Sequence, residues 1–405
     1  MFSNNLKVEK VKEITSDIFP EDHKYLTFLK KVFRHEFRKN GFRRISTDII
    51  ENGVFRTNPE TGIMKAYLNN NIIEEIQPVY YYFMDHYFNN DKQVEFIGAE
   101  IIGENDPVLD AICIYVVYTV LNKIGLEGTF SIKINSNGVE KEMLKYKEEL
   151  QNFYENKKHL LSTESLELLN KDPIKLLTSE LEDEMILASQ APNIIKYLKK
   201  DSKTHYAKFK EYLELLGVPF NEDHRLSSGV EYATNNLWEF VSDTGIIIGK
   251  GFRHNGLAKE LGNTKEISAT GFYTDAMIVI DMLKSRNIKI RNKDEIDLFF
   301  VQLGDEAKTV VIPLSLKARD AGINTVVSLG TPSMKEQMLK ANRSGAKYVV
   351  MVGIMEARNG VFQVRNTESG TQEEVKKEEL IDYIIGKIGT NKLDFYCPAK
   401  DLITE

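Results

Sequence analysis

The sequence is poor in cysteine and has no long apolar run. Its two cysteines, Cys113 and Cys397, are too few and too far apart for a disulfide framework or a zinc site. The longest apolar stretch, residues 111–121, is well short of the roughly 20 residues that a membrane-spanning helix requires. The N-terminal residues MFSNNLKVEKVKEITSD lack the apolar centre of a signal peptide. We therefore expect a cytoplasmic protein that has no membrane partner.

The sequence also lacks an excess of positive charge and a metal-ligand pattern. The formal net charge is -7, so the field of the whole molecule would not attract nucleic acid, and RNA binding would need a local basic patch. The seven histidines show no ligand spacing, and we expect no protein-bound metal and no DNA partner. A length of 405 residues predicts two or three domains.

The first 137 residues read mainly as antiparallel strands. A helix with apolar residues at helical spacing is expected at residues 26–40 and ends at Gly41. Strands are expected at 42–51, 78–88 and 94–102. Because the strands follow one another without regular helices between them, the pattern predicts an α+β fold with an antiparallel sheet.

The remaining chain divides into three parts. Long charged helices fill residues 138–223, which predicts a helical insertion. Strands resume within 224–290 and complete the first sheet, with a helix at 276–285. Strands and helices then alternate in residues 294–405, which predicts a separate α/β domain with a partly parallel sheet.

Several segments resemble histidyl-tRNA synthetases in order and spacing. They are SDIFPED at 16–22, FRKNGFRRISTDIIE at 37–51, NPETG at 58–62, KQVEFIGAEIIG at 92–103, LSSGVEYATNNLWEF at 226–240, GKGFRHNGLAKELG at 249–262 and SMKEQMLKANRSGAKYVVMVG at 333–353. One such segment alone would be a weak signal, but their agreement in order is a strong one.

This resemblance implies a class II synthetase catalytic domain, interrupted by the helical insertion and followed by an anticodon-binding domain. It also implies a homodimer, because the segment at 37–51 resembles the dimer-forming motif of class II enzymes. The apolar face that such a dimer would bury is expected on the first helix, at Phe28, Val32, Phe33 and Phe37.

The resemblance also locates the groups that the chemistry needs. Amino-acid activation attacks the α-phosphate of ATP, so guanidinium groups must stabilise negative charge that grows in the transition state. The three arginines with this role in the family fall at Met84, Ser228 and Ile278. Three further family positions are also changed, at Asp48, Phe96 and Ala233. The sequence therefore predicts no catalytic residues.

Five polar positions of the family's histidine pocket are retained: Glu60, Glu100, Glu231, Tyr232 and Arg253. One interpretation is a residual pocket for histidine or a similar cation, with Glu100 at the position that binds the imidazole in the family. The other is that these residues now only support the fold. Because the phosphate-binding groups are missing, we favour the second.

The last domain carries a set of basic residues on or beside its expected helices: Lys317, Arg319, Lys335, Lys340, Arg343 and Lys347. The resemblance implies that they contact the anticodon arm of a tRNA, where phosphates supply affinity and unstacked bases supply sequence information. The pattern alone favours a solvated face of mixed charge, because acidic residues such as Asp305 and Glu336 are interleaved with them.

Three functions follow from these observations. The first is a paralogue of histidyl-tRNA synthetase that has lost aminoacylation and binds tRNA or a partner protein. The second is a divergent but active histidine-tRNA ligase, the only case in which ATP and Mg would be cofactors. The third is a regulatory subunit like that of ATP phosphoribosyltransferase, which ranks last because that family generally lacks the anticodon-binding domain.

Overall fold

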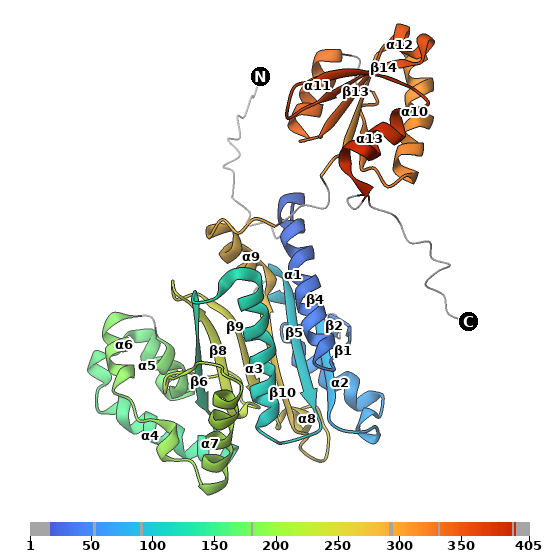
Figure 1. The fold of residues 1–405 in the computed structure, drawn as a ribbon. Helices are drawn as coiled ribbons and strands as arrows, with labels where there is room; N and C mark the ends of the chain where they lie inside the picture. The colour runs from blue at the N-terminus through green and yellow to red at the C-terminus, as the bar shows by residue number, and fades with distance from the viewer. Residues whose placement is uncertain are drawn as a thin grey trace, which may run out of the picture. The chain divides into compact units, whose positions relative to one another are not determined.

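The computed structural model describes residues 17–51, 54–89, 92–179, 181–290, 295–330, 333–390 and 393. The chain divides into two compact units, Met1–Ile290 and Arg291–Glu405, which are shown in Figure 1. Cys397 lies outside the described residues.

The first unit is built on an eight-stranded sheet with the order β1-β4-β5-β10-β9-β8-β6-β7. Its inner strands pair antiparallel, and short parallel strands close each edge. The expected antiparallel architecture is thus confirmed. The strands are β1 (Arg43–Arg44), β4 (Val79–Asn89), β5 (Lys92–Ile102), β6 (Phe130–Ser136), β7 (Asn221–Glu222), β8 (Thr234–Ser242), β9 (Ile247–Arg253) and β10 (Ala269–Asp275).

Two details of the sheet differ from the sequence-based expectation. The single strand expected at 42–51 is wrong, because β1 pairs with β4 whereas β2 (Ile50–Glu51) pairs separately with β3 (Val54–Phe55). The strand β10, at the centre of the sheet, is not predicted from the sequence. Its sequence ATGFYTD is rich in small residues and lacks the β-branched character typical of a central strand.

Helices cover both faces of this sheet. The helices α1 (Pro20–Lys39), α3 (Val108–Leu121), α7 (Lys200–Leu215) and α9 (Ala276–Ser285) contribute to the large core on one face (Figure 1). The helices α2 (Pro59–Asn69) and α8 (Leu257–Glu260) contribute to a second core on the other face. Strand residues alternate between these cores: Ala99 and Ile101 belong to the first, and Ile102 to the second.

The apolar side of α1 faces its own chain. Phe33 and Phe37 are 0% and 1% exposed, and Phe28 and Val32 pack against the same core. The expectation that a dimer would bury these residues is therefore wrong for Phe33 and Phe37, and for the half-buried Phe28 and Val32 it stays a prediction. Helical periodicity predicted an apolar stripe correctly, but it could not tell which partner would bury the stripe.

The helix α3 continues through a π turn, Asn122–Leu126. Among the described residues, the combined stretch Val108–Leu126 is the one helix long and apolar enough to cross a membrane, judged by length and composition alone. It packs against α1, α7 and β10, and its Cys113 is 2% exposed. This stretch is the central core helix of the unit.

The region expected to be a helical insertion contains α4 (Glu140–Glu155), α5 (Thr163–Lys171) and α6 (Glu182–Ser189), linked by short 3-10 turns. These helices share a small core of their own. The next helix, α7, differs from them because Phe209 and Leu213 belong to the core beneath the main sheet.

The second unit has a five-stranded sheet with the order β12-β11-β13-β14-β15. Its first three strands are parallel and the last two antiparallel, which confirms the expected partly parallel sheet. The elements are β11 (Leu298–Gln302), α10 (Asp305–Asp320), β12 (Thr325–Val327), α11 (Met334–Arg343), β13 (Tyr348–Val352), α12 (Ile354–Asn359), β14 (Val361–Asn366), β15 (Gln372–Lys376) and α13 (Leu380–Ile388). The helices α10 and α13 share one core and α11 packs in the other.

Candidate functional site

Two buried carboxylates lie on the sheet face covered by α2. Glu60 is in the first turn of α2 and Glu100 is on β5, and they are 2% and 3% exposed. The hydroxyl of Tyr232 donates a hydrogen bond of 2.8 Å to Oε1 of Glu60. Nε2 of His254, directly after β9, lies 3.2 Å from Oε2 of Glu100. We call these four residues the carboxylate cluster.

The charges of the carboxylate cluster are coupled. Burial raises the pKa of Glu60, opposed by the charge of His254 and reinforced by that of Glu100. Burial alone would lower the pKa of His254, but the negative charges of Glu100 and Glu60 outweigh it, so the pKa of His254 is raised. The two acids therefore favour the protonated form of the His254 ring.

A glycine leaves the space that Glu100 occupies. Gly271 on β10 pairs directly with Glu100 across the sheet. A Cβ at position 271 would lie 2.0 Å from Oε1 of Glu100, much closer than two atoms can approach. A small residue at the centre of β10 is thus a condition for burying this carboxylate.

Aromatic side chains fill the same face beside the acids. Phe96 stands 5.0 Å from Tyr273 and 5.6 Å from Tyr87, measured between ring centroids. Burial raises the pKa of Tyr87 to about 12. Phe96, at the position of a substrate-reading glutamine in the resemblance, is 7% exposed and offers no hydrogen bond. This part of the face is therefore lined by aromatic rings.

Arg253 does not join the carboxylate cluster. Its guanidinium, 0% exposed, donates to Asp110 over 3.1 Å and to the backbone carbonyls of Glu104 and Asp106. Asp110, in the first turn of α3, also accepts hydrogen bonds from Asn236 and Thr270.

The hydrogen bonds of Asp110 with Arg253, Asn236 and Thr270 thus connect α3 to β9, β8 and β10. Glu231 is apart as well, since it lies exposed in the turn before β8. Of the five retained positions, the structure brings together Glu60, Glu100 and Tyr232.

The three positions aligned with the family's arginines have three different environments. Met84 on β4 is buried in the core on the α1 side of the sheet. Ser228 accepts a hydrogen bond of 3.1 Å from Asn137, and Ile278 is half-buried in the first turn of α9. The described side chains of β4 on the Glu100 side are Val79, Tyr81, Phe83, Asp85 and Tyr87, and none of them is basic.

Sequence reasoning missed three residues of this region: His254, Asp110 and Gly271. His254 was grouped with the other histidines, although its position in the segment GFRHNGL, beside Arg253, was a usable signal. Asp110 carried no signal, because its partner Arg253 is 143 residues away.

The basic residues of the second unit do not form one patch. Lys317 and Arg319 lie on α10, whereas Lys335, Lys340 and Arg343 lie on α11, which packs against the opposite face of the sheet. Near the start of β13, the ammonium of Lys347 is held 2.8 Å from Asp297 and 3.3 Å from Glu295. Lys347 is therefore largely neutralised by its own chain.

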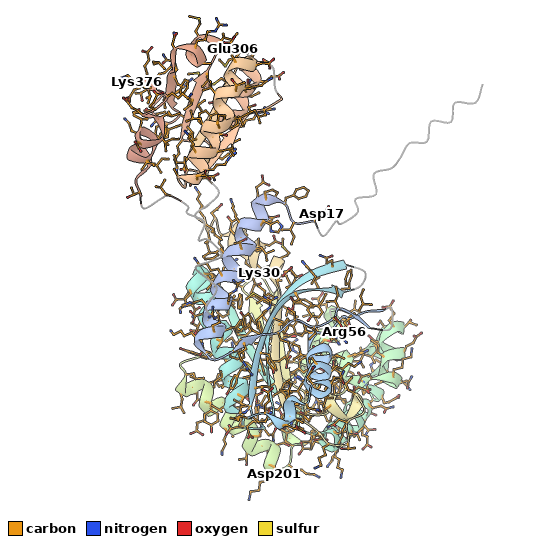
Figure 2. All side chains as sticks on the ribbon, turned by 90° about the vertical axis from the view of Figure 1, so that its right-hand side faces the viewer. Asp17, Lys30, Arg56, Asp201, Glu306 and Lys376 are labelled. Atoms are coloured by element: carbon orange, nitrogen blue, oxygen red, sulfur yellow. The ribbon has the colours of Figure 1, made fainter. Side chains whose placement is uncertain are left out.

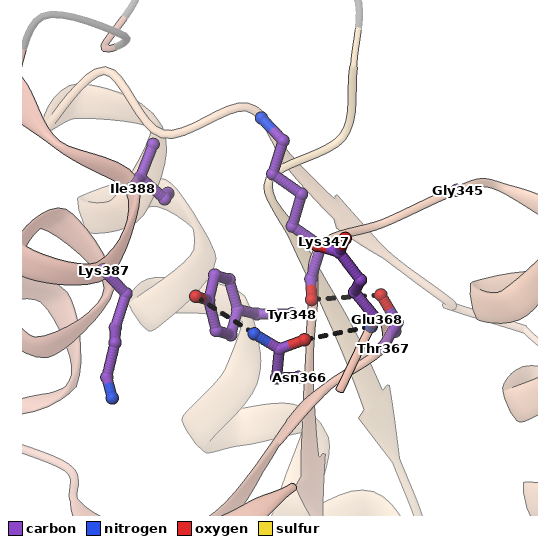
Figure 3. A pocket seen from close by; sticks show the side chains of 8 residues that line it. All are labelled: Gly345, Lys347, Tyr348, Asn366, Thr367, Glu368, Lys387 and Ile388. Carbon is purple, nitrogen blue, oxygen red and sulfur yellow. Dashed lines mark hydrogen bonds between the residues drawn. The ribbon is translucent and has the colours of Figure 1, made fainter. Parts of the chain in front are cut away.

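The second unit has a hollow of about 360 Å³ beside Lys347. Tyr348, Asn366 and Lys387 help line it, and the Asn366 amide donates a 3.3 Å hydrogen bond to the Tyr348 hydroxyl (Figure 3). Lys387 is 3.3 Å from Glu373. Both lysines at this hollow are compensated by acids, and Glu368 also lines it, so the hollow carries no excess of positive charge.

Comparison with known proteins agrees with this two-unit architecture. Residues 297–387 match the family described as an anticodon binding domain. The histidine-tRNA ligase of Halothermothrix orenii is 30% identical over 360 residues, covering 83% of this chain and 85% of that protein. The histidine-tRNA ligase of Thermotoga petrophila is 28% identical over 414 residues, covering 92% of this chain and 97% of that protein.

Solved structures give the same result. Apo histidyl-tRNA synthetase from S. aureus superposes with a TM-score of 0.76 at 26% identity, covering 93% of this chain and 99% of that one. An ATP phosphoribosyltransferase regulatory subunit/histidyl-tRNA synthetase from Bacillus halodurans C shares the fold, with a TM-score of 0.60 at 17% identity, covering 83% of this chain and 96% of that one. The chain belongs to the histidyl-tRNA synthetase family.

Proposed function

We propose that this protein is a histidyl-tRNA synthetase paralogue that has lost aminoacylation and binds tRNA through its anticodon-binding domain. It would act in the cytoplasm as a class II homodimer. The observation that carries the loss of activity is the closed carboxylate cluster. Glu60 and Glu100, the acids that would meet a cationic substrate, already contact the chain's own Tyr232 and His254.

The phosphate side of the reaction supports the same proposal. The strand β4 contains no lysine or arginine, and the residues at positions 228 and 278 are serine and isoleucine. Removing one such donor of transition-state stabilisation typically costs about 100- to 1000-fold in rate. Although losses within one site do not simply multiply, three of them should leave little activity.

The test is histidine-dependent exchange of pyrophosphate into ATP, measured with ATP, Mg and the full-length protein. We expect no exchange above a control without histidine. Clear exchange would replace this proposal by the divergent ligase. In that case Lys250 on β9, 5.7 Å from the Tyr273 ring, is the first cation to test, and Lys250→Met should abolish the activity.

The tRNA-binding half of the proposal has its own test. We expect the full-length protein to bind an anticodon stem-loop with strong salt dependence, because neutralised phosphates release counterions. Arg343→Glu should weaken this binding, since Arg343 is exposed on α11. Lys347→Gln should have a smaller effect, because Asp297 and Glu295 already neutralise Lys347. No stem-loop binding at low salt would leave a protein-binding role.

The regulatory-subunit alternative is the weakest of the three. The Bacillus halodurans structure supports it through the fold alone. The anticodon-binding domain at 297–387 argues against it.

A further inference from the structure

We propose that the outer side of α1 is a second RNA-binding surface, which contacts the phosphate backbone of a tRNA outside the anticodon stem-loop. The surface consists of Lys31, Arg34, His35, Arg38 and Lys39, and we call it the α1 basic face. The identity of its partner rests on the proposed tRNA binding. The surface itself is argued from α1 alone.

Helical geometry places these five residues together. Their spacings of three, four, seven and eight residues from Lys31 return to the same side of an α-helix. At a rise of about 1.5 Å per residue, the face extends for roughly 12 Å along the axis. All five are exposed on the single chain, and a shallow hollow of about 460 Å³ is lined by these five residues. Arg38 and Lys39 also fall in the segment 37–51 that resembles the dimer-forming motif. Figure 2 shows the side chains of this helix, on which Lys30 is labelled.

The charges of this face are not offset by acids. Among the described residues, no ion pair is found for Lys31, Arg34, Arg38 or Lys39. This separates them from Lys30, which lies 2.5 Å from the buried Glu95.

The nearest acid on α1 does not compensate the face either. Glu36 is 3% exposed and its Oε1 lies 2.6 Å from the ammonium of Lys123. His35 stands 3.9 Å from the same carboxylate, which Lys123 already neutralises. The outer side of α1 is therefore a locally positive surface on a protein whose net charge is -7.

A structural role for the helix itself accounts for only part of this pattern. Cations in the last turn stabilise a helix by interacting with its dipole, an effect that falls off beyond that turn. Arg38 and Lys39 are in the last turn of α1, whereas Lys31 and Arg34 lie further back. Interaction with the helix dipole therefore does not explain the positive charges of Lys31 and Arg34.

The surroundings favour RNA over other anionic partners. A helix that binds a membrane must insert an apolar side, but the apolar side of α1 is buried in the core through Phe33 and Phe37. The face contains two arginines, whose planar guanidinium groups suit phosphate oxygens. The relatives of this chain are named as tRNA ligases, and a tRNA offers a continuous phosphate backbone.

The test compares two RNA probes on the full-length protein: a fluorescein-labelled tRNA transcript and the isolated anticodon stem-loop. The reversal variant is Lys31→Glu/Arg34→Glu/Arg38→Glu. The matched control is Lys200→Glu/Lys203→Glu/Lys208→Glu, which makes the same change in net charge on exposed residues of α7. Fluorescence of Trp238, the single tryptophan, reports whether each variant remains folded. The neutral variant Lys31→Gln/Arg34→Gln/Arg38→Gln is used if the reversal unfolds.

We expect the reversal to weaken binding of the whole tRNA at least tenfold and to leave stem-loop binding unchanged. The slope of log affinity against log salt should become shallower by about 2 to 3, since each lost phosphate contact contributes roughly 0.7 to 0.9. An equal effect of the α7 control would overturn the inference, because the loss would then come from net charge.

The failure of this inference is distinguishable from failure of the proposed function. If Arg343→Glu weakens stem-loop binding while the α1 reversal leaves whole-tRNA binding intact, the α1 inference falls and the proposed function stands. If neither RNA binds, tRNA binding falls and the α1 inference falls with it. Binding of polyglutamate but of neither RNA would assign the face to an acidic protein instead.

Discussion

Oε2 of Glu100 lies 3.2 Å from Nε2 of His254, with both side chains withdrawn from solvent. The acid that the family resemblance assigns to a substrate imidazole thus faces an imidazole of the same chain. The two residues come from neighbouring parts of one sheet, β5 and the end of β9, on either side of β10. The contact between Glu100 and His254 is therefore built into the sheet.

The first prediction concerns the pH dependence of stability. The pKa of His254 is raised in the folded protein, so the folded state holds this proton more tightly than the unfolded state does. The resulting stability is fully present below the unfolded pKa of about 6.5 and is lost as pH rises through the folded pKa. Between these two pKa values, stability should fall by about 1.4 kcal/mol for each unit of pH. Urea unfolding followed by Trp238 fluorescence between pH 6 and 9 measures it.

The variant His254→Gln should lack this part of the pH dependence. The difference in unfolding free energy between the wild type and the variant should shrink as pH rises. Glu60 also has a raised pKa in the folded state and is present in both proteins, so the difference between the wild type and the variant isolates the histidine effect. A difference that stays constant with pH would mean that His254 is not held as a cation.

The second prediction is rescue by free imidazole. His254→Ala should lower the melting temperature, because the buried Glu60 and Glu100 lose their cation. Imidazole that refills the space should raise it again, by the mass-action gain that any ligand of the folded state gives. Thermal melts over a millimolar imidazole series, at constant pH and ionic strength, follow the effect.

The control for the rescue is His205→Ala. The His205 ring is partly buried in the same unit and lies 3.2 Å from the backbone carbonyl of Asn105. Among the described residues it forms no ion pair with a carboxylate, although the charge of Asp110 acts on it. Its melting temperature should respond to imidazole no more than that of the wild type. An equal response in all three proteins would remove the argument that His254 fills a cation site.

How far the sequence could predict this structure differs from residue to residue. The helix α9 was placed at its observed bounds, 276–285, because local periodicity is set within the segment. The strand β10 was missed because Gly271 and Thr270 are dictated by Glu100 and Asp110, which lie far away in the chain. Glu60 and Glu100 were singled out by resemblance alone, and no local pattern could reveal that His254 would meet one of them.

Arg253 shows the opposite error, a residue that the resemblance placed in the pocket and that lies elsewhere in the structure. The family pattern marked it as a pocket residue, yet its guanidinium is bound to Asp110.

The third prediction follows: Arg253→Met should destabilise the protein by about 3 to 5 kcal/mol, because it leaves a buried carboxylate without its counter-charge. Urea unfolding measures this, and adding Asp110→Asn to the variant should recover part of the loss.

An exposed ion pair supplies the comparison for Arg253. Lys259 and Glu266 are 2.8 Å apart at 53% and 56% exposure, so Lys259→Met should destabilise the protein far less than Arg253→Met does, because solvent screens an exposed pair. Equal costs for the two substitutions would show that the Asp110 network adds nothing beyond a surface pair.

The last prediction concerns the glycine that makes room for Glu100. In Gly271→Ala, the new methyl would lie 2.0 Å from Oε1 of Glu100, so the carboxylate must move away from His254. Overpacking of this kind typically costs about 1 to 3 kcal/mol. Gly256→Ala serves as the control, because its Cβ would meet nothing closer than 3.5 Å and should change stability little. If the clash with Glu100 is the cause, the substitution Glu100→Ala should remove most of the penalty in the double variant, a coupling that residues in contact show and distant ones do not. A penalty that persists without the carboxylate would place the strain in the backbone of β10 instead, and Gly271 would then have no part in holding Glu100 against His254.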